Sequence, residues 1–452
     1  MADGSFTGRE DIMTDLSRRA FLGSITAAGA VAAAGGAPRD AHAQGGKPIH
    51  FFGWTFGVPV VTEVVQEYDR RSGKKVSYGN MPWAQYAEGM AAKFVGKAPL
   101  DVVYVSDSDM VAWADAGWIV PIEEFPETRA YRGDLLPAVL EASTHKGKLH
   151  GLPYYADYMA FVYNEEMLRK AGLEAPPQTW DDLVRQSLTM KQKKVVEYPL
   201  LLHLEASTWM IEVLYAQVYS RGGRLFDDKY EPVFDQADSA ALDTLRWLID
   251  AKEKHKILHP GTLEIGEIAG LKAFSSGQAA FYLTGRYRLK DLNTPETSQV
   301  AGKVKLGLMP RGAAGKNETV GWARLFSLTG QAAADPERKA QAWPFMQYMG
   351  GKSDKGTYEI PKLFTEKFFN GVGWKPLFND PEVRALIGRY SDATLQEKQS
   401  ALSRPKDGLK ARWFTEWDQF NRVVWQKAIL RQTEPLAALK SSAEKWRSLR
   451  KA

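Results

Sequence analysis

The side chains that could hold a ligand in this sequence are mostly aromatic rings and carboxylates. The chain has no cysteine, and its seven histidines fall singly, with no HExxH motif. Disulfides, iron–sulfur clusters and thiolate metal sites are therefore excluded, and we predict no metal site, no cofactor and no catalytic residue. The chain instead has 14 Trp, 18 Tyr and 20 Phe. Trp and Tyr combine a flat apolar face with a polar edge, which suits a ligand that offers C–H faces and hydroxyls, as a sugar does.

Several of these candidates follow predicted strands. "PIHFFGWTF" indicates a buried strand that ends in a loop, and Val102 to Val105 form a continuous apolar run, typical of a strand covered on both faces. Helical spacing in the segments between gives the order strand, helix, strand, helix, strand of a doubly wound α/β fold. Ligands bind beyond the carboxyl ends of such strands. This places Trp54 and Phe56 at one rim with Ser106 and Asp107.

The same patterns continue along the chain. We expect a strand over Met159 to Tyr163, and then a helix over Glu165 to Ala171 that ends at Gly172. Thr179 is expected to cap the next helix, and Ala279 to Leu283 form a later strand.

The first 43 residues have the order of an export signal. "SRRAFLG" is followed by an uncharged Ala/Gly-rich run, and "AHA" closes it at Ala43. Paired arginines, a short apolar core and a small-residue cleavage site predict a twin-arginine signal peptide over residues 1–43, with Gln44 as the first mature residue. Met13 is an alternative start, and a membrane-anchoring helix is the alternative for the apolar run.

The charge of the chain is nearly balanced. It has 59 Lys+Arg against 54 Asp+Glu, with no dense basic block, so we do not predict a nucleic-acid partner. The part after residue 43 is long enough for two large lobes.

Several motifs occur in a characteristic order. These are "DVVYV", "GLPY", "YNEEMLRKAGLEAPPQTWDDL", "GQAAFYLTGRY" and "VKLGLMPRG". In this order the chain resembles the extracellular solute-binding proteins of bacterial ABC importers, in the sugar-binding, maltose-binding-protein-like branch. The resemblance covers nearly all of the chain after residue 43. It implies a type II periplasmic-binding-protein fold: two α/β lobes joined by a hinge of crossing strands, with the ligand cleft between them.

The resemblance also implies where the lobes divide. The crossings are expected near Pro153 to Asp157, Met309 to Lys316 and Gly350 to Lys355. The first lobe then comprises residues 48–154 with 312–352, and the second 156–308 with 353–452.

The chain departs from the family after the "GQAAFYLTG" strand. Where the family usually has Gly-Pro-Trp or Gly-x-Trp, this chain has Gly285, Arg286 and Tyr287. Tyr287 keeps an aromatic ring where the family stacks a sugar, and a second cation, Arg324, lies just beyond the predicted contacts Gly321 and Trp322. Two converging arginines would need either an acid of the protein or an anionic ligand between them, and the sequence leaves both open.

The remaining site predictions depend on position. Tyr155 and Asp157 face the cleft if the hinge is placed correctly, Trp83 opens a helix, and Trp209 and Trp374 are expected at the cleft by position only. For each aromatic residue, packing in the core is the alternative. Four further tryptophans recur at helical spacing and are assigned to the core: Trp413, Trp417, Trp425 and Trp446.

Two other chemistries are alternatives to these roles. The adjacent Tyr154 and Tyr155 resemble the phenolate pair of periplasmic iron binders, although this pair sits in the "GLPY" motif. Asp107 and Asp157 resemble a glycosidase carboxylate pair. Hydrogen bonds to ligand hydroxyls explain the carboxylates more simply.

The sequence therefore predicts a monomeric periplasmic protein that binds a sugar or sugar derivative and delivers it to a membrane permease. It is predicted not to be an enzyme. The alternatives are the same fold with an anionic or other non-sugar solute, or an exported hydrolase or cofactor enzyme.

Overall fold

The computed structural model describes residues 47–451. The predicted signal peptide, residues 1–43, lies outside the described residues. None of the helices described within residues 47–451 is long and apolar enough to cross a membrane.

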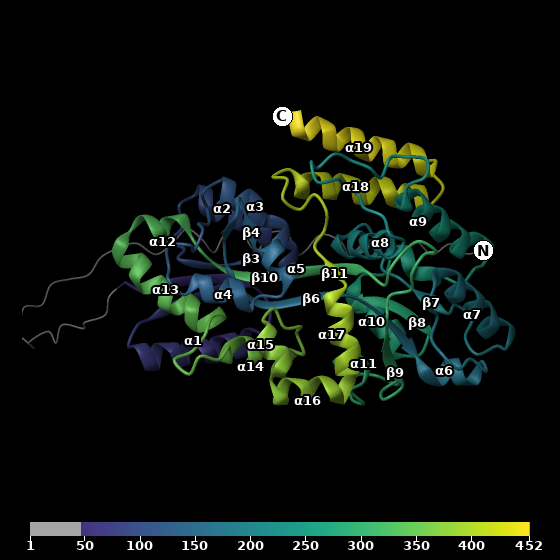
Figure 1. Cartoon of the computed structure of the whole chain (residues 1–452), viewed down its shortest axis with the longest axis horizontal. Helices are drawn as coiled ribbons and strands as arrows, with labels where there is room; N and C mark the ends of the chain where they lie inside the picture. The colour runs from purple at the N-terminus through teal and green to yellow at the C-terminus, as the bar shows by residue number, and fades with distance from the viewer. Residues whose placement is uncertain (1–46, 452) are drawn as a thin grey trace, which may run out of the picture. The chain divides into compact units, whose positions relative to one another are not determined.

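A mixed sheet of nine strands organises the described chain (Figure 1). Its hydrogen-bonded order is β2-β1-β3-β10-β6-β8-β7, with β9 paired to β6 and β11 paired to β10. The bounds are β1 (Ile49–Trp54), β2 (Val76–Met81), β3 (Val102–Ser106), β6 (Leu152–Asn164), β7 (Leu200–Leu201), β8 (Phe281–Gly285), β9 (Val304–Gly307), β10 (Thr319–Leu328) and β11 (Ser403–Arg404). A separate hairpin joins β4 (Thr144–His145) to β5 (Lys148–Leu149).

Helices connect and cover these strands. Those before β6, with the two that follow β10, are α1 (Val58–Ser72), α2 (Trp83–Val95), α3 (Asp107–Asp115), α4 (Thr128–Asp134), α5 (Pro137–Ala142), α12 (Gly330–Ala334) and α13 (Pro336–Gly350). Between β6 and β9 lie α6 (Glu165–Lys170), α7 (Trp180–Gln192), α8 (Thr208–Ser220), α9 (Ala240–Ile249), α10 (Glu267–Ser275) and α11 (Arg288–Leu292), with a π-helical turn at Asp250–Lys254 and a 3-10 turn at Pro260–Leu263. The last helices are α14 (Glu359–Phe368), α15 (Lys375–Asn379), α16 (Pro381–Tyr390), α17 (Ala393–Ala401), α18 (Phe414–Ile429) and α19 (Pro435–Lys451).

The local signals that predicted the first elements are confirmed. α1 buries Val61, Val64, Val65 and Tyr68, and it ends at Gly73, whose φ of 66° is a left-handed conformation that glycine adopts without strain. Every residue of β3 is buried, as expected for a strand covered on both faces.

Later elements are confirmed in kind but shifted in extent. Thr179 caps α7 through a full capping box with Asp182. β6 begins at Leu152, well before the predicted Met159, because β10 pairs with its first half as far as Leu152. β8 ends at Gly285 rather than Leu283, because its pairing with β6 continues to that residue.

Two hydrophobic cores lie on opposite faces of β6. Met159 and Phe161 belong to one core, with α8, Trp417, Trp425 and Trp446, which we call the second core. Tyr158, Ala160 and Val162 belong to the other, with the residues of β3, which we call the first core. The alternation follows from the pleat of a strand, which points successive side chains to opposite faces.

The predicted hinge lies along this same strand. The stretch predicted as the first crossing, Pro153 to Asp157, is part of β6 and pairs with β10. In Figure 1, α14 to α17 lie on one side of the β6–β10 pair, and α8 and α18 lie on the other. The lobe boundaries themselves stay a prediction.

Candidate ligand-binding site

The predicted ligand residues first gather at the carboxyl ends of β1 and β3. These strands are parallel neighbours, with Phe51 opposite Val102, so Trp54 and Ser106 end at the same edge of the sheet. Ser106 is the N-cap of α3, where its hydroxyl oxygen accepts a bond from the Asp109 backbone N–H at 3.2 Å and its hydroxyl donates to Asp109 Oδ2 at 2.7 Å. Asp107, the first residue of α3, is fully buried beside it.

Arg324 of β10 joins this edge through a buried ion pair. β10 runs antiparallel to β3 with Arg324 opposite Ser106. The Arg324 Nη1 donates to Asp107 Oδ1 at 2.9 Å, and the Ala323 backbone N–H donates to Asp107 Oδ2 at 3.1 Å. The guanidinium lies over the Trp83 ring, 5.2 Å from its centroid, which is cation–π geometry.

A second buried ion pair lies close to the first. Glu212 of α8 pairs with Lys406, which precedes α18, at 3.3 Å between Lys406 Nζ and Glu212 Oε1, and both side chains are less than a tenth exposed. We call Asp107, Asp109, Glu212, Arg324 and Lys406 the Arg324 cluster. They come from α3, α8, β10 and the segment after β11.

The pKa shifts of the cluster reflect burial and mutual charge. Burial raises the pKa of Glu212, although the nearby cations Lys406 and Arg324 oppose this. Burial likewise raises the pKa of Asp109, against the hydroxyl bond from Ser106 and the charge of Arg324. Burial alone would lower the pKa of Arg324, but Asp107, with Tyr155 and Glu212 contributing less, raises it above its ordinary value, so the guanidinium remains charged.

Aromatic rings surround the cluster. Trp83 is 41% exposed and stands edge-on against the buried Trp54, 5.0 Å away. Phe56 is half-buried between Tyr155, at 6.1 Å, and Phe368, at 4.7 Å. An exposed indole beside paired charges is the kind of surface that a polyhydroxylated ligand would cover.

More aromatic side chains continue the site toward α8 and α10. Trp209 meets Trp322 edge to face at 6.0 Å. Tyr287 donates from its hydroxyl to Glu267, and burial followed by the charge of Glu267 raises its pKa. Burial raises the pKa of Tyr155 too, with the charge of Glu267 contributing, and Tyr155 in turn contributes to the raised pKa of Tyr287.

Arg286 lies apart from this group, although it is adjacent to Tyr287 in the chain. Its Nε and Nη2 donate to the two carboxylate oxygens of Asp157, at 2.9 and 3.1 Å, its Nη1 donates to Gln396 at 3.1 Å, and Nη2 also donates to the Phe369 carbonyl. Asp157 also accepts the backbone N–H groups of Gly371 and Tyr158. The Arg286 guanidinium lies over the ring of Phe369, a residue of the first core, whereas Tyr287 packs against the second core.

The two arginines therefore do not converge on one ligand. Each is held by its own aspartate, so the sequence alternative of an acid of the protein as partner is confirmed. The basis for predicting an anionic ligand is lost, because both positive charges are already neutralised.

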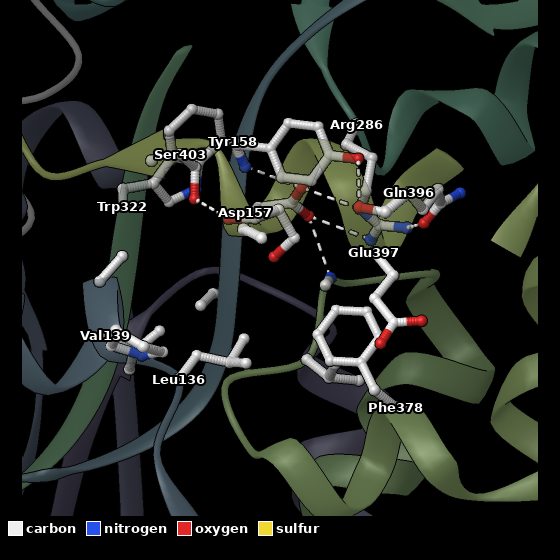
Figure 2. Close-up of a pocket in the computed structure, with 18 of the residues that line it drawn as sticks. Leu136, Val139, Asp157, Tyr158, Arg286, Trp322, Phe378, Gln396, Glu397 and Ser403 are labelled. Atoms are coloured by element: carbon white, nitrogen blue, oxygen red, sulfur yellow. Dashed lines mark hydrogen bonds and ion pairs between the residues drawn. The ribbon is translucent and has the colours of Figure 1, made fainter. Parts of the chain in front are cut away.

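The Arg286–Asp157 pair borders a cavity of about 420 Å³ (Figure 2). Gly321 and Trp322 also line it, together with α5, the segment 370–372, α15 to α17 and β11. Figure 2 shows Leu136 and Val139 on one side of the pair and Phe378 on another. The predicted site residues thus divide between two places, the Arg324 cluster with its aromatic rings and the border of this cavity.

Two tryptophans of the predicted site are packed in the first core. Trp374 is fully buried, donates its indole N–H to the Pro153 carbonyl at 3.0 Å and stacks on Tyr358 at 4.1 Å. The expectation that Trp374 contacts ligand is wrong in this structure, because its ring fills the core behind β6. Trp54 is 4% exposed and packs against Trp83, so it supports the Trp83 ring from beneath the surface.

The two rival chemistries find no support in this geometry. Tyr154 is buried, stacks on Tyr104 at 4.8 Å, and burial raises its pKa far above the ordinary value, so it is a poor source of a phenolate. Asp107 and Asp157 are each engaged by a different arginine rather than facing each other. Within residues 47–451, no group of three or more His, Asp or Glu side chains is arranged to hold a metal ion.

Asp109, Glu212 and Lys406 are the residues of the Arg324 cluster that the sequence analysis did not predict. Glu212 carried a signal, since it is the lone carboxylate in the apolar helix "TWMIEVLYAQVYS", all of whose residues from Met210 on are buried. Lys406 carried none, because its partner lies 194 residues away in the chain.

The fold matches that of two-lobed periplasmic binding proteins of known structure. A maltose-bound structure of T. maritima MalE3 superposes with a TM-score of 0.77 at 19% identity, over 89% of this chain and 99% of that one. A solute-binding protein of an ABC transporter from Agrobacterium radiobacter, solved with ribitol, superposes with a TM-score of 0.75 at 19% identity, over 90% of this chain and 99% of that one. The predicted fold class is confirmed.

The chain belongs to the bacterial extracellular solute-binding protein family, which matches residues 58–356. Among characterised relatives, a mannitol-binding protein of Pseudomonas aeruginosa is 24% identical over 254 residues, 55% of this chain. The match spans 57% of that relative's length.

Proposed function

We propose that the chain is the periplasmic binding component of an ABC importer, that it captures a neutral sugar or sugar alcohol, and that it performs no reaction on the ligand. The observation that carries the proposal is the Arg324 cluster, where paired charges meet an exposed indole at the carboxyl ends of two parallel strands. The names and ligands of the three similar proteins, mannitol, ribitol and maltose, agree with it.

The cluster suits hydroxyl groups for a physical reason. A hydroxyl both donates and accepts, so it bonds equally well to the carboxylates and to the guanidinium or ammonium group. Arg324 and Lys406 are each paired with a carboxylate, so an anionic ligand would have to displace a buried partner. The rings of Trp83 and Tyr155 would cover the C–H faces of the ligand.

Closure of two lobes around the ligand is part of the proposal. Thr415, which follows the start of α18, donates to the Ser108 carbonyl of α3 at 3.4 Å, and these two helices belong to different predicted lobes. A permease would recognise the closed form. Small-angle scattering should show compaction at saturating ligand, and an unchanged radius would contradict closure.

Export through the twin-arginine signal is the third part. Arg18→Lys/Arg19→Lys should leave the precursor in the cytoplasm, since this signal is read by a receptor. Normal amounts of mature protein in the periplasm of that variant would contradict the routing.

The ligand is tested directly with residues 44–452. Thermal-shift measurements with mannitol, ribitol and maltose, beside the sugar acids gluconate and glucuronate, should show stabilisation by a neutral compound only, because a ligand bound to the native state alone raises the melting temperature. Calorimetry then compares wild type with Arg324→Ala, which should bind about 30-fold more weakly, the loss of about 2 kcal/mol expected when a buried charge loses its partner. Stabilisation by the acids alone would contradict the proposal.

A further inference from the structure

The cavity beside Arg286 is lined by residues other than those of the Arg324 cluster. In the β6–β10 pair, Tyr155 is opposite Arg324, and Ala156 is opposite Ala323. Cross-strand partners share a face, and neighbours along a strand alternate. Ala156, Tyr158 and Gly321, on the face of Ala323, line the cavity, and Asp157 and Trp322, on the face of Arg324, border it as well. No residue of the Arg324 cluster lines it.

The chemistry of its walls differs from that of the sugar site. Leu136 and Val139 on one side, and Val372, Phe378 and Ile387 on the other, make them largely apolar. The volume of about 420 Å³ falls within the range of about 300–1,000 Å³ typical of small-molecule sites, which are lined in the same way.

The polar groups at this cavity leave no net charge to be matched. Arg286 and Asp157 neutralise each other, and all the oxygen positions of Asp157 are engaged by N–H donors. Around the cavity, Glu141 and Glu397 balance Lys375 and Arg404. Because these charges sum to zero, an ion entering the cavity would lose water without gaining a net counter-charge.

One end of the cavity offers hydroxyl groups. Ser400 and Ser403 line it, and Ser403 donates its hydroxyl hydrogen to the Ser400 carbonyl at 2.6 Å, which leaves the oxygen of Ser403 as an acceptor. A ligand hydroxyl could donate there while its apolar body lies against Phe378 and Val139.

From these observations we infer a second ligand site in this cavity, specific for an uncharged, mainly apolar small molecule that carries a hydroxyl group. The site is separate from the proposed sugar site and does not depend on the identity of the sugar.

The test uses 4-fluorobenzyl alcohol as a probe, observed by fluorine NMR with the mature protein. Binding should be saturable with half-saturation at about 1 mM or below, as befits a ligand of this size. The ions 4-fluorobenzoate and 4-fluorobenzylamine should bind at least about fivefold more weakly, since burial of an unmatched charge is unfavourable.

A variant whose new side chain fills the cavity tests whether the probe binds there. Ala401 is exposed at the end of α17 and lines the cavity, so Ala401→Trp should weaken probe binding about tenfold or more by steric exclusion. Lys398→Trp, on the same helix but outside the lining, is the matched control and should bind as wild type does. Glu397→Trp is a second filling variant, and near-ultraviolet circular dichroism verifies that each variant is folded.

Three results would overturn the inference. They are the absence of saturable probe binding, equal binding by folded wild type and both filling variants, and equal binding of the charged analogues. Competition between mannitol and the probe for one site would also overturn it, because the cavity would then be the sugar site.

Discussion

Replacement of Arg286 separates a structural role from a ligand-binding role. In Arg286→Met, the buried carboxylate of Asp157 keeps the N–H groups of Gly371 and Tyr158 but loses its counter-charge, and the Phe369 carbonyl and Gln396 each lose a donor. Removal of one partner of a buried ion pair costs about 3–5 kcal/mol of the free energy of unfolding. With an unfolding entropy of about 0.9 kcal/mol/K for a chain of this size, the melting temperature should fall by about 3–6 °C.

The sugar affinity of folded Arg286→Met should stay within about threefold of wild type, because the Arg286 side chain bonds to Asp157, Gln396 and Phe369 and to no residue of the Arg324 cluster. Asp157→Asn/Arg286→Met should recover at least half of the lost stability, since no uncompensated charge remains buried. Arg185→Met is the matched control: its ion pair with Asp182 has an arginine side chain 71% exposed, so its loss should cost under about 0.5 kcal/mol.

Differential scanning calorimetry and isothermal titration of the same samples measure both quantities. A variant with an unchanged melting temperature and an affinity reduced tenfold or more would refute this reasoning and restore Arg286 as a ligand contact.

The exposed Trp83 and the buried Trp374 should behave in opposite ways. Trp83→Ala should weaken sugar binding by about 1.5 kcal/mol or more with little change in melting temperature, whereas Trp374→Ala should cost about 3–5 kcal/mol of stability and leave the affinity of the folded protein unchanged; the reverse pattern in titration and unfolding would contradict the assignment. His203 is fully buried with its ring nitrogen bonded to the Tyr282 hydroxyl, and burial lowers its pKa from 6.5 to about 4. Because the unfolded chain binds this proton more readily, stability is complete above pH 6.5 and is lost as the pH falls toward 4, by up to about 3 kcal/mol. Urea unfolding at several pH values should show a shallower acid loss in His203→Gln than in wild type or in the control His255→Gln, and parallel curves for all three would contradict it.

Much of the fold could be predicted because its signals are local. The glycine that ends α1, the threonine that caps α7 and the apolar run of β3 act through neighbours in the chain, so their types and spacing suffice. The parallel pairing of β1 with β3 then brings Trp54 and Ser106 to one edge, as the alternation of strands and helices predicted.

The composition of the site was decided by contacts between distant segments. Arg286 and Tyr287 are adjacent in the sequence, but their side chains have different partners: Arg286 bonds to Asp157 and lies over Phe369 of the first core, whereas Tyr287 bonds to Glu267 and packs against the second core. The sequence did not indicate that Lys406 would form an ion pair with Glu212, because this pair depends on how the segment after β11 packs against α8. Whether a charge meets a ligand or a partner depends on strand register and on which face of a pleat it occupies, and a shift of one residue reverses that face. Sequence spacing therefore determined the elements, and tertiary packing alone determined the partners of Arg286, Arg324 and Glu212.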